Sequence, residues 1–188
     1  MSLDSSEPLS LSISSSPPQD ATRSASIHVL TEADRCDGVE LLVSLDLESR
    51  CSRFGYAASD AALITHSRSA LQNSCSMLGI LTNDKLLGLA EIYRRDDAHY
   101  EVSFVVERPS RRRGHGWRLL RSSMHWARKA NAASLQMIFP RHNWAMRKLA
   151  AKARAQLDLS LDELNAEIWI SNETHADRAH APALSPFF

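Results

Sequence analysis

The chain has 188 residues, of which 44% are hydrophobic and 23% are charged, a composition typical of one soluble globular domain with tails. Its 22 Lys and Arg residues balance its 22 Asp and Glu residues, so the formal net charge is zero. Domains whose main partner is nucleic acid usually carry net positive charge. The balance of charges therefore disfavours nucleic acid as the partner of this chain.

The three cysteines, Cys36, Cys51 and Cys75, are scattered and have no CxxC or CxxH spacing. This pattern fits a reducing cytosol and argues against a disulfide framework or a zinc site. No apolar run approaches the roughly 18 residues of a membrane span, and the N-terminus lacks the basic and apolar regions of a secretory signal. We therefore expect a cytoplasmic protein with no membrane segment and no metal.

Both ends of the chain have the composition of tails. Residues 1–26 are rich in Ser, contain three prolines and have few large apolar side chains. Such a segment cannot bury enough apolar surface to offset the entropy lost on ordering. Residues 171–188 contain two prolines and show no clear hydrophobic period. We therefore expect a disordered tail at 1–26, one domain at 27–170 and a loose tail at 171–188.

Hydrophobic periodicity predicts a mixture of strands and helices in this domain. Asn83-Asp84 is a turn signal and predicts a hairpin. A single helix joins the strand near residue 100 to the strand near residue 136, which predicts a right-handed βαβ crossover. The expected fold is of the α/β (α+β) class, a mixed and mostly antiparallel sheet with helices on both faces. In chain order we expect a strand at 27–30, a helix at 31–45, an irregular segment at 46–59, a helix at 60–71, strands at 77–81, 85–94 and 99–106, a helix after residue 116, a strand at 135–139, a helix after residue 143, and short strands at 156–159 and 166–170.

The most informative stretch follows the strand at 99–106, where Arg108-Pro109-Ser110 interrupts the pattern and Arg111-Arg112-Arg113-Gly114-His115-Gly116 leads into an apolar helical face. Glycines without a Cβ let a diphosphate approach the backbone, and the first N–H groups of a helix point at the anion. Arginines add charge and bidentate contacts. A basic run is more often a solvated face, but the strand before it and the helix after it favour a phosphate-binding loop.

The pattern Arg111-x-x-Gly114-x-Gly116 resembles motif A of the GNAT acetyltransferase superfamily, which reads Q/R-x-x-G-x-G/A. Downstream, Asn143-x-x-Met146-x-x-Leu149-Ala150-x-Lys152 is similar to a second segment of that family. The resemblance extends in element order from about residue 27 to residue 170. It implies a GNAT-like fold and an N-acetyltransferase that transfers acetyl from acetyl-CoA directly to a primary amine. It also implies a small-molecule or protein acceptor and no metal, and homodimers are common in the family.

The resemblance also implies which residues bind the cofactor. The loop would hold the pyrophosphate of acetyl-CoA, the strand before it would offer backbone groups to the pantetheine arm, and the asparagine of the second segment would lie near the acyl end. The residues expected to contact the cofactor are Phe104, Val105, Val106, Arg111, Arg112, Arg113, Gly114, His115, Gly116, Trp117 and Asn143.

Acyl transfer to an amine needs a polarised thioester carbonyl, here by the N–H of Val105 or Val106, and a base for the amine proton. Glu101 is the first candidate base, Glu91 the second and His99 the third. Glu101 could instead be an exposed strand residue paired with Arg94 or Arg95. Many family members use a Tyr as general acid where this chain has Ala150, so the acid role is open.

The segment 48–56 follows the first expected helix, and the resemblance implies that such a segment forms part of the acceptor pocket. Arg53 and Phe54 are its candidate substrate-binding residues. Two other functions stay open. The absence of the Tyr favours a non-catalytic acetyl-CoA-binding sensor, and the run of arginines favours a nucleic-acid-binding module, which the net charge disfavours.

Overall fold

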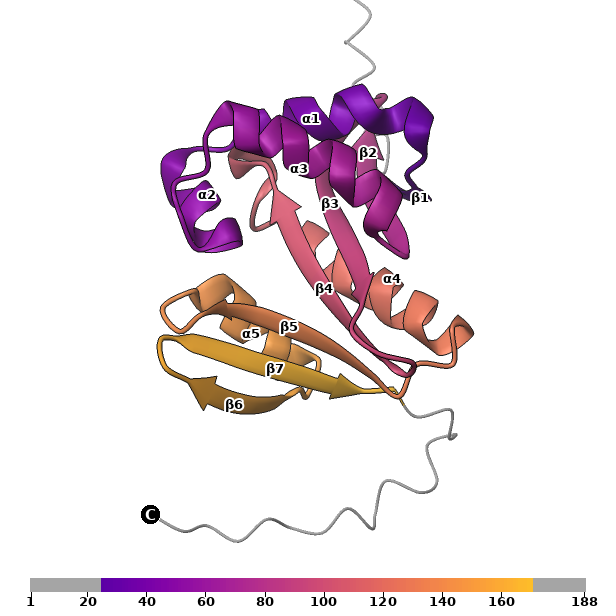
Figure 1. Cartoon of the computed structure of the whole chain (residues 1–188), viewed down its shortest axis with the longest axis vertical. Coiled ribbons are helices and arrows are strands. Elements are labelled where there is room, and N and C mark those ends of the chain that lie inside the picture. The colour runs from indigo at the N-terminus through magenta and orange to yellow at the C-terminus, as the bar shows by residue number, and fades with distance from the viewer. Residues whose placement is uncertain (1–24, 171–188) are drawn as a thin grey trace, which may run out of the picture.

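The computed structural model describes residues 25–170 (Figure 1), and the two expected tails fall almost wholly outside that range. Ser26, expected at the end of the first tail, is instead the first residue of β1. The strands are β1 (Ser26–Val29), β2 (Ser76–Thr82), β3 (Lys85–Arg94), β4 (His99–Val106), β5 (Ser134–Pro140), β6 (Gln156–Ser160) and β7 (Glu163–Trp169). The helices are α1 (Arg35–Val43), α2 (Leu47–Phe54), α3 (Asp60–Asn73), α4 (His115–Lys129) and α5 (Trp144–Lys152), with 3-10 turns at Glu32–Asp34 and Arg108–Ser110.

The seven strands form one sheet in the order β1-β2-β3-β4-β5-β7-β6. All neighbours are antiparallel except β4 and β5, which α4 joins in parallel as the expected crossover. These two strands pair only from His99–Ser134 to Glu101–Gln136 and then separate (Figure 1). The expected mixed, mostly antiparallel sheet of the α/β class is confirmed.

Two hydrophobic clusters hold the layers together. One lies between α1, α3 and the face of β2 to β4 that includes Leu89 and Val105. The other lies on the opposite face, where α4 and α5 cover Ile92, Val102 and Leu135. Side chains such as Leu120 are completely buried, and truncating a side chain of this kind typically removes about 2–5 kcal/mol of stability. The helices therefore cover both faces of the N-terminal strands.

The hairpin between β2 and β3 follows from its turn residues. Asn83 and Asp84 have φ values of 50° and 60°, in the left-handed region that a two-residue hairpin turn requires. Asn and Asp tolerate this region better than other side-chain-bearing residues. The turn therefore forms where the sequence predicts it.

The expectation of an irregular segment at 46–59 was wrong, because α2 lies inside it. The carboxylate of Asp46 accepts the backbone N–H of Ser49 at 2.8 Å and caps the N-terminus of this helix. Gly55 ends it in the left-handed conformation with φ 79°. Arg50 then fixes the helix by donating to the carbonyl oxygens of Leu45 and Ala58, at 2.8 and 2.9 Å.

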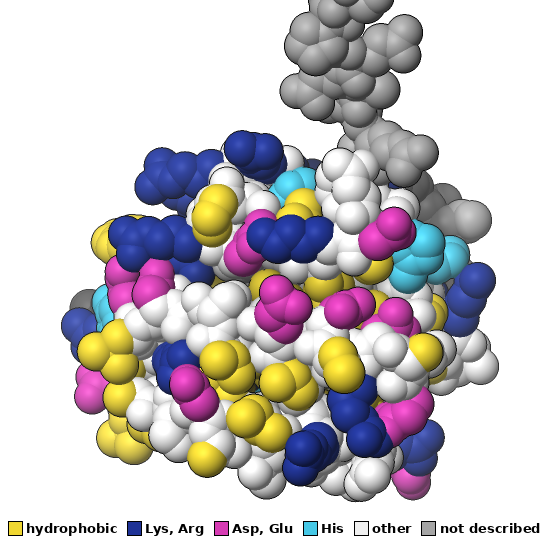
Figure 2. Space-filling model, turned by 90° about the horizontal axis from the view of Figure 1, so that it is seen from above, with side chains coloured by type: hydrophobic (Ala, Val, Ile, Leu, Met, Phe, Trp, Pro, Cys, Tyr) yellow, Lys and Arg dark blue, Asp and Glu magenta, His cyan; other side chains and the backbone are white. Residues whose placement is uncertain are grey.

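Figure 2 views the molecule from above, on the side of α1. Lys and Arg side chains alternate there with Asp and Glu side chains, so no single sign of charge dominates this face. Among residues 25–170, no helix is both long and apolar enough to cross a membrane.

Candidate active site

The loop before α4 has the backbone that an anion site requires. Gly114 is the residue before α4 and has φ 83°, and an added Cβ there would meet no atom within 4 Å. Gly116 lies in the first turn, where an added Cβ would lie 3.4 Å from Cδ1 of Leu149. Arg112 and Arg113 are exposed beside this turn. The loop therefore presents an open, positively charged helix N-terminus.

His115 follows Gly114 and is buried. Its Nδ1 atom has no hydrogen-bond partner among the described residues. Burial lowers the pKa of this imidazole, and the charges of Arg118 and Arg113 lower it further. The ring is therefore neutral near pH 7 and keeps an unused polar atom beside the loop.

The backbone of β4 is free on one side beyond its pairing with β5. The N–H of Glu107 donates to Leu87 O and the N–H of Arg95 donates to His99 O, both at 2.9 Å. Between these points the antiparallel ladder alternates, so odd-numbered residues of β4 turn their N–H toward β3 and even-numbered residues turn theirs toward β5. Beyond Glu101–Gln136 the two strands no longer pair, and we call the space between them the opening. Phe104 and Val106 therefore direct their N–H groups into the opening, whereas the N–H of Val105 faces β3.

Asn143 joins the second sequence motif to α2. Its Oδ1 accepts the N–H of Met146 at 3.1 Å and caps α5, and its Nδ2 donates to Oγ of Ser52 at 2.6 Å. Arg111 reaches the same helix, because its Nη2 donates to Oγ of Ser49 at 2.6 Å. The loop and the second motif thus converge on α2 from the two sides of the opening.

Trp117 and Ala150 lie on the helices behind the opening. Nζ of Lys152 lies 4.4 Å from the ring centroid of Trp117, so this ring packs under α5. Ala150 is completely buried in the core. No hydroxyl is therefore present where many family members are expected to carry a Tyr.

Glu91 is completely buried and lies at the centre of a polar cluster. It forms an ion pair with Arg53 of α2, and both its oxygens lie within 3.1 Å of Nε2 of His66 on α3. The hydroxyl of Tyr93 is 3.4 Å from Oε2 of Glu91. Phe54 packs edge to face on His66, with ring centroids 5.1 Å apart. The cluster fastens α2 and α3 to the sheet.

The charges in this cluster shift the pKa values of its members. Burial alone would raise the pKa of Glu91, but Arg53 and His66 overcome it and hold the pKa below its ordinary value. Burial raises the pKa of Tyr93, and the negative charge of Glu91 raises it further. Glu91 is therefore ionised, and Tyr93 is a neutral phenol, at neutral pH.

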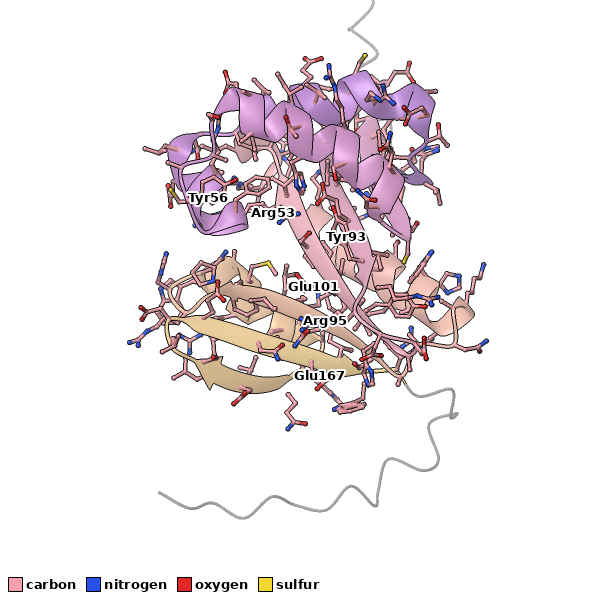
Figure 3. The ribbon with its side chains drawn as sticks, viewed as in Figure 1. Arg53, Tyr56, Tyr93, Arg95, Glu101 and Glu167 are labelled. Carbon is pink, nitrogen blue, oxygen red and sulfur yellow. The ribbon has the colours of Figure 1, made fainter. Side chains whose placement is uncertain are left out.

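Glu101 lies on the same face of the sheet as Glu91 but is open to solvent. The register pairs it with Tyr93, and 34% of its side chain is exposed. Nη1 of Arg95 lies 3.2 Å from its Oε2. His99, two residues away, donates from its Nδ1 to the carboxylate of Asp96 at 2.7 Å. Figure 3 shows Arg53 on α2 and Tyr56 just after this helix on one side of the opening, and Glu101, Arg95 and Glu167 following one another toward β7 on the other.

The expected site residues therefore fall into two groups. The loop, the end of β4 and Asn143 surround the opening between β4 and β5, and Glu101 borders it. Arg53 and Glu91, expected in separate roles, contact each other. His66, Ser49 and Ser52 are site residues that the sequence reasoning missed. The two serines follow Asp46 at helical spacing and precede Gly55, a capping pattern that predicts a helix with both on one side. His66 has no comparable signal.

No group of three or more His, Cys, Asp and Glu side chains within residues 25–170 is arranged to hold a metal ion.

Comparison with known proteins agrees with this geometry. The model of the acetyltransferase (GNAT) family matches residues 44–156, which is more than half of the chain. A search of curated proteins found no match. Among solved structures, the GNAT domain of PAT from S. lividans is similar at 17% identity with a TM-score of 0.68, covering 76% of this chain and 89% of that one.

Two further structures were solved with a cofactor. The putative acetyltransferase yncA from Salmonella typhimurium, with its cofactor acetyl-CoA, has 14% identity and a TM-score of 0.61, covering 82% of this chain and 99% of that one. The paia N-acetyltransferase from Thermoplasma acidophilum, in complex with coenzyme A, has 15% identity and a TM-score of 0.60, covering 78% and 99%. At these identities the structures establish the fold, and the family model establishes the assignment. The chain belongs to the GNAT family of acetyltransferases.

Proposed function

We propose that the protein transfers the acetyl group of acetyl-CoA to a primary amine. The observation that carries this proposal is the position of the loop at Gly114, which follows β4 beyond the point where β4 and β5 separate. One opening thus offers an anion site at its end and free backbone groups along its wall. Such an arrangement fits a long donor with a diphosphate at one end and a thioester at the other.

The residues present fit acetyl-CoA. The open space at Gly114, the exposed side chains of Arg112 and Arg113 and the first backbone N–H groups of α4, which begins at His115, would surround the diphosphate. The N–H groups of Phe104 and Val106 would hold the pantetheine arm and polarise the carbonyl. Val105, expected to polarise the carbonyl, would not do so, because its N–H faces β3 and its side chain packs in the core. Bound acetyl-CoA supplies an activated thioester carbonyl.

Glu101 would take the proton of the amine, directly or through a water molecule, because it borders the opening and is open to solvent. Glu91 is the second carboxylate of the proposal. It is buried and bonded to Arg53 and His66, so we assign it a structural role. It would hold α2 in position, and α2 would line the acceptor pocket. Phe54 and Arg53 would then shape that wall from α2.

Ala150 favours a second candidate, a sensor that binds acetyl-CoA without transferring acetyl. A buried methyl group cannot protonate a thiolate leaving group, so a serine or water would have to act as the acid, or the reaction would proceed without one. A sensor would bind the donor and release no CoA thiol with any amine.

The experiment has a binding arm and a catalytic arm. Acetyl-CoA should raise the melting temperature, because it binds only the folded state. Gly114→Glu should abolish this rise by placing a charge and a strained backbone at the anion site. Gly55→Glu is the matched control, because Gly55 has φ 79° and open space around it but lies at the end of α2. CoA-thiol release across a panel of amines tests transfer, and the absence of any melting shift at saturating donor would refute the proposal.

A further inference from the structure

One half of the sheet has an uncovered face. Side chains alternate along β5, β7 and β6, and those of Leu135, Ala166 and Ile168 are buried on the side of α4 and α5. In the described part of the chain the opposite face of β7 and β6 carries no helix, whereas α2 contacts β5, and Figure 1 shows this face in front with α5 behind. The register places on this open face Gln136, Ile138, Gln156, Asp158, Glu163, Asn165, Glu167 and Trp169.

The open face is continuous with the candidate active site. The register places Glu101 of β4 beside Gln136 of β5, and Gln136 beside Glu167 of β7. The parallel pairing of β4 and β5 ends at Glu101. A ligand whose amine reaches Glu101 at the opening would therefore lie over this face.

The charge of the open face is one-sided. Four carboxylates belong to it, those of Glu101, Asp158, Glu163 and Glu167. Two basic side chains lie at its border, Arg95, which pairs with Glu101, and His99, which pairs with Asp96. Glu167 accepts a hydrogen bond from the hydroxyl of Ser134 at 2.7 Å and forms no ion pair within residues 25–170. The whole chain is neutral, so this concentration of negative charge is local.

Apolar surface accompanies these carboxylates. Trp169 is 56% exposed and Ile138 is 39% exposed, and both lie on the same face. Exposed aromatic rings attract Lys and Arg cations, and apolar side chains contact the methylene stems of those residues. The face is therefore complementary to Lys and Arg side chains. Its carboxylates attract their positive charge, and its apolar side chains contact their methylene groups.

The breadth of the face decides the kind of occupant. Asp158 on β6 lies three strand spacings from Glu101 on β4, which is roughly 14 Å. An extended peptide covers this distance with about four residues. A short diamine would leave the carboxylates of β6 and β7 uncovered.

We propose that the open face of β5, β7 and β6 binds a basic peptide segment, and that the acceptor amine is a lysine side chain within that segment. The proposal rests on the acetyl transfer proposed above. Neighbouring Lys or Arg residues of the segment contact Glu167 and Asp158, and their stems pack on Trp169 and Ile138. The acceptor lysine extends past Glu101 into the opening between β4 and β5.

The test uses the full chain, acetyl-CoA and peptides of about ten residues, each with one central lysine flanked by Arg, by Gly and Ser, or by Glu. 1,4-Diaminobutane serves as the small-molecule arm. We expect the Arg-flanked peptide to have the highest kcat/KM, and its advantage to fall as salt rises. Glu167→Gln and Asp158→Asn should each reduce that advantage by roughly fivefold, the upper end for an exposed ion pair, mainly through KM. The advantage is measured as the ratio of kcat/KM for the Arg-flanked peptide to that for the neutral peptide in the same variant.

Asp84→Asn is the matched control, because it removes one carboxylate from the turn between β2 and β3, away from this face. A second readout is the binding of a fluorescent Arg-flanked peptide without donor, which does not depend on transfer. Thiol release with equal rates for the three peptides, or a preference for 1,4-diaminobutane, overturns the peptide proposal and leaves acetyl transfer intact. Salt-sensitive peptide binding without any thiol release supports the peptide site and refutes transfer.

Discussion

Nδ2 of Asn143 donates a hydrogen bond to Oγ of Ser52 at 2.6 Å, and this contact joins α5 to α2 across the opening between β4 and β5. The same asparagine caps α5 through its Oδ1. The residue that would lie near the acyl end of the donor is thus also the residue that links the helix on the acceptor side to the C-terminal half of the molecule. Its two contacts can be separated by mutation.

Asn143→Ala removes both contacts and should lower the free energy of unfolding by about 1–2 kcal/mol, the range for an N-cap. Ser52→Ala removes only the link to α2 and should cost about 1 kcal/mol. Asn143→Asp should stay near the wild-type value, because a carboxylate oxygen caps the helix and accepts from the Ser52 hydroxyl. Urea denaturation without donor measures all three. Equal losses for Asn143→Asp and Asn143→Ala would contradict the assignment of the cap.

Glu91→Gln should lower the free energy of unfolding by about 3–5 kcal/mol, because it leaves the guanidinium of Arg53 in a buried site without a charged partner. The matched control is Glu40→Gln, an exposed carboxylate on α1, which should change stability by less than about 0.5 kcal/mol. Both values come from denaturation at pH 7. A loss below 1 kcal/mol for Glu91→Gln would mean that the cluster does not hold α2.

The pH dependence of stability follows from the same residue. The pKa of Glu91 is lower in the folded protein than its ordinary value of 4.5, so the unfolded chain binds the proton more readily. Its contribution is therefore fully present above pH 4.5 and is lost as the pH falls through the folded pKa. Unfolding free energies at falling pH should show a loss that Glu91→Gln lacks. Parallel curves for the two proteins would exclude Glu91 as the source.

Glu101→Gln should lower kcat by about 100-fold or more with a small change in KM, because the amide keeps the size of the side chain but cannot take a proton. The acidic limb of the pH–rate profile should disappear in this variant. Glu40→Gln again controls for the loss of one carboxylate. If Glu101→Gln changed only KM, Glu101 would bind the acceptor and would not act as the base.

Leu161 should be replaceable with a gain in stability. It has φ 51° in the turn between β6 and β7, and 93% of the residue is exposed. Leu161→Gly should raise the unfolding free energy by about 1 kcal/mol, because glycine adopts this conformation without strain and no packing is lost. Leu159→Gly, within β6, should lower it. Thermal unfolding distinguishes the two signs.

The sequence predicted the features that depend on neighbouring residues. The strand at 99–106 and the glycine loop are local patterns, and the order of strands and helices around α4 follows from them. The helix α2 was missed because its apolar residues are few, although its caps, Asp46 and Gly55, are visible in the sequence. The Glu91–Arg53 pair could not be predicted, since it joins residues 38 positions apart through packing that no local pattern encodes.

The short parallel pairing of β4 and β5 also has a consequence for native-state fluctuations. Within residues 25–170, the register from His99–Ser134 to Glu101–Gln136 and the adjacent bond from the N–H of Ala133 to the carbonyl of Ala98 connect the two blocks of the sheet, while α4 packs across β2 to β5. Elements joined by few such bonds tend to open as separate cooperative units. We therefore expect two exchange classes of backbone amide. The hydrogens of β5, β7 and β6 should exchange together at a lower free energy than those of β2 and β3, and the boundary should lie between β4 and β5.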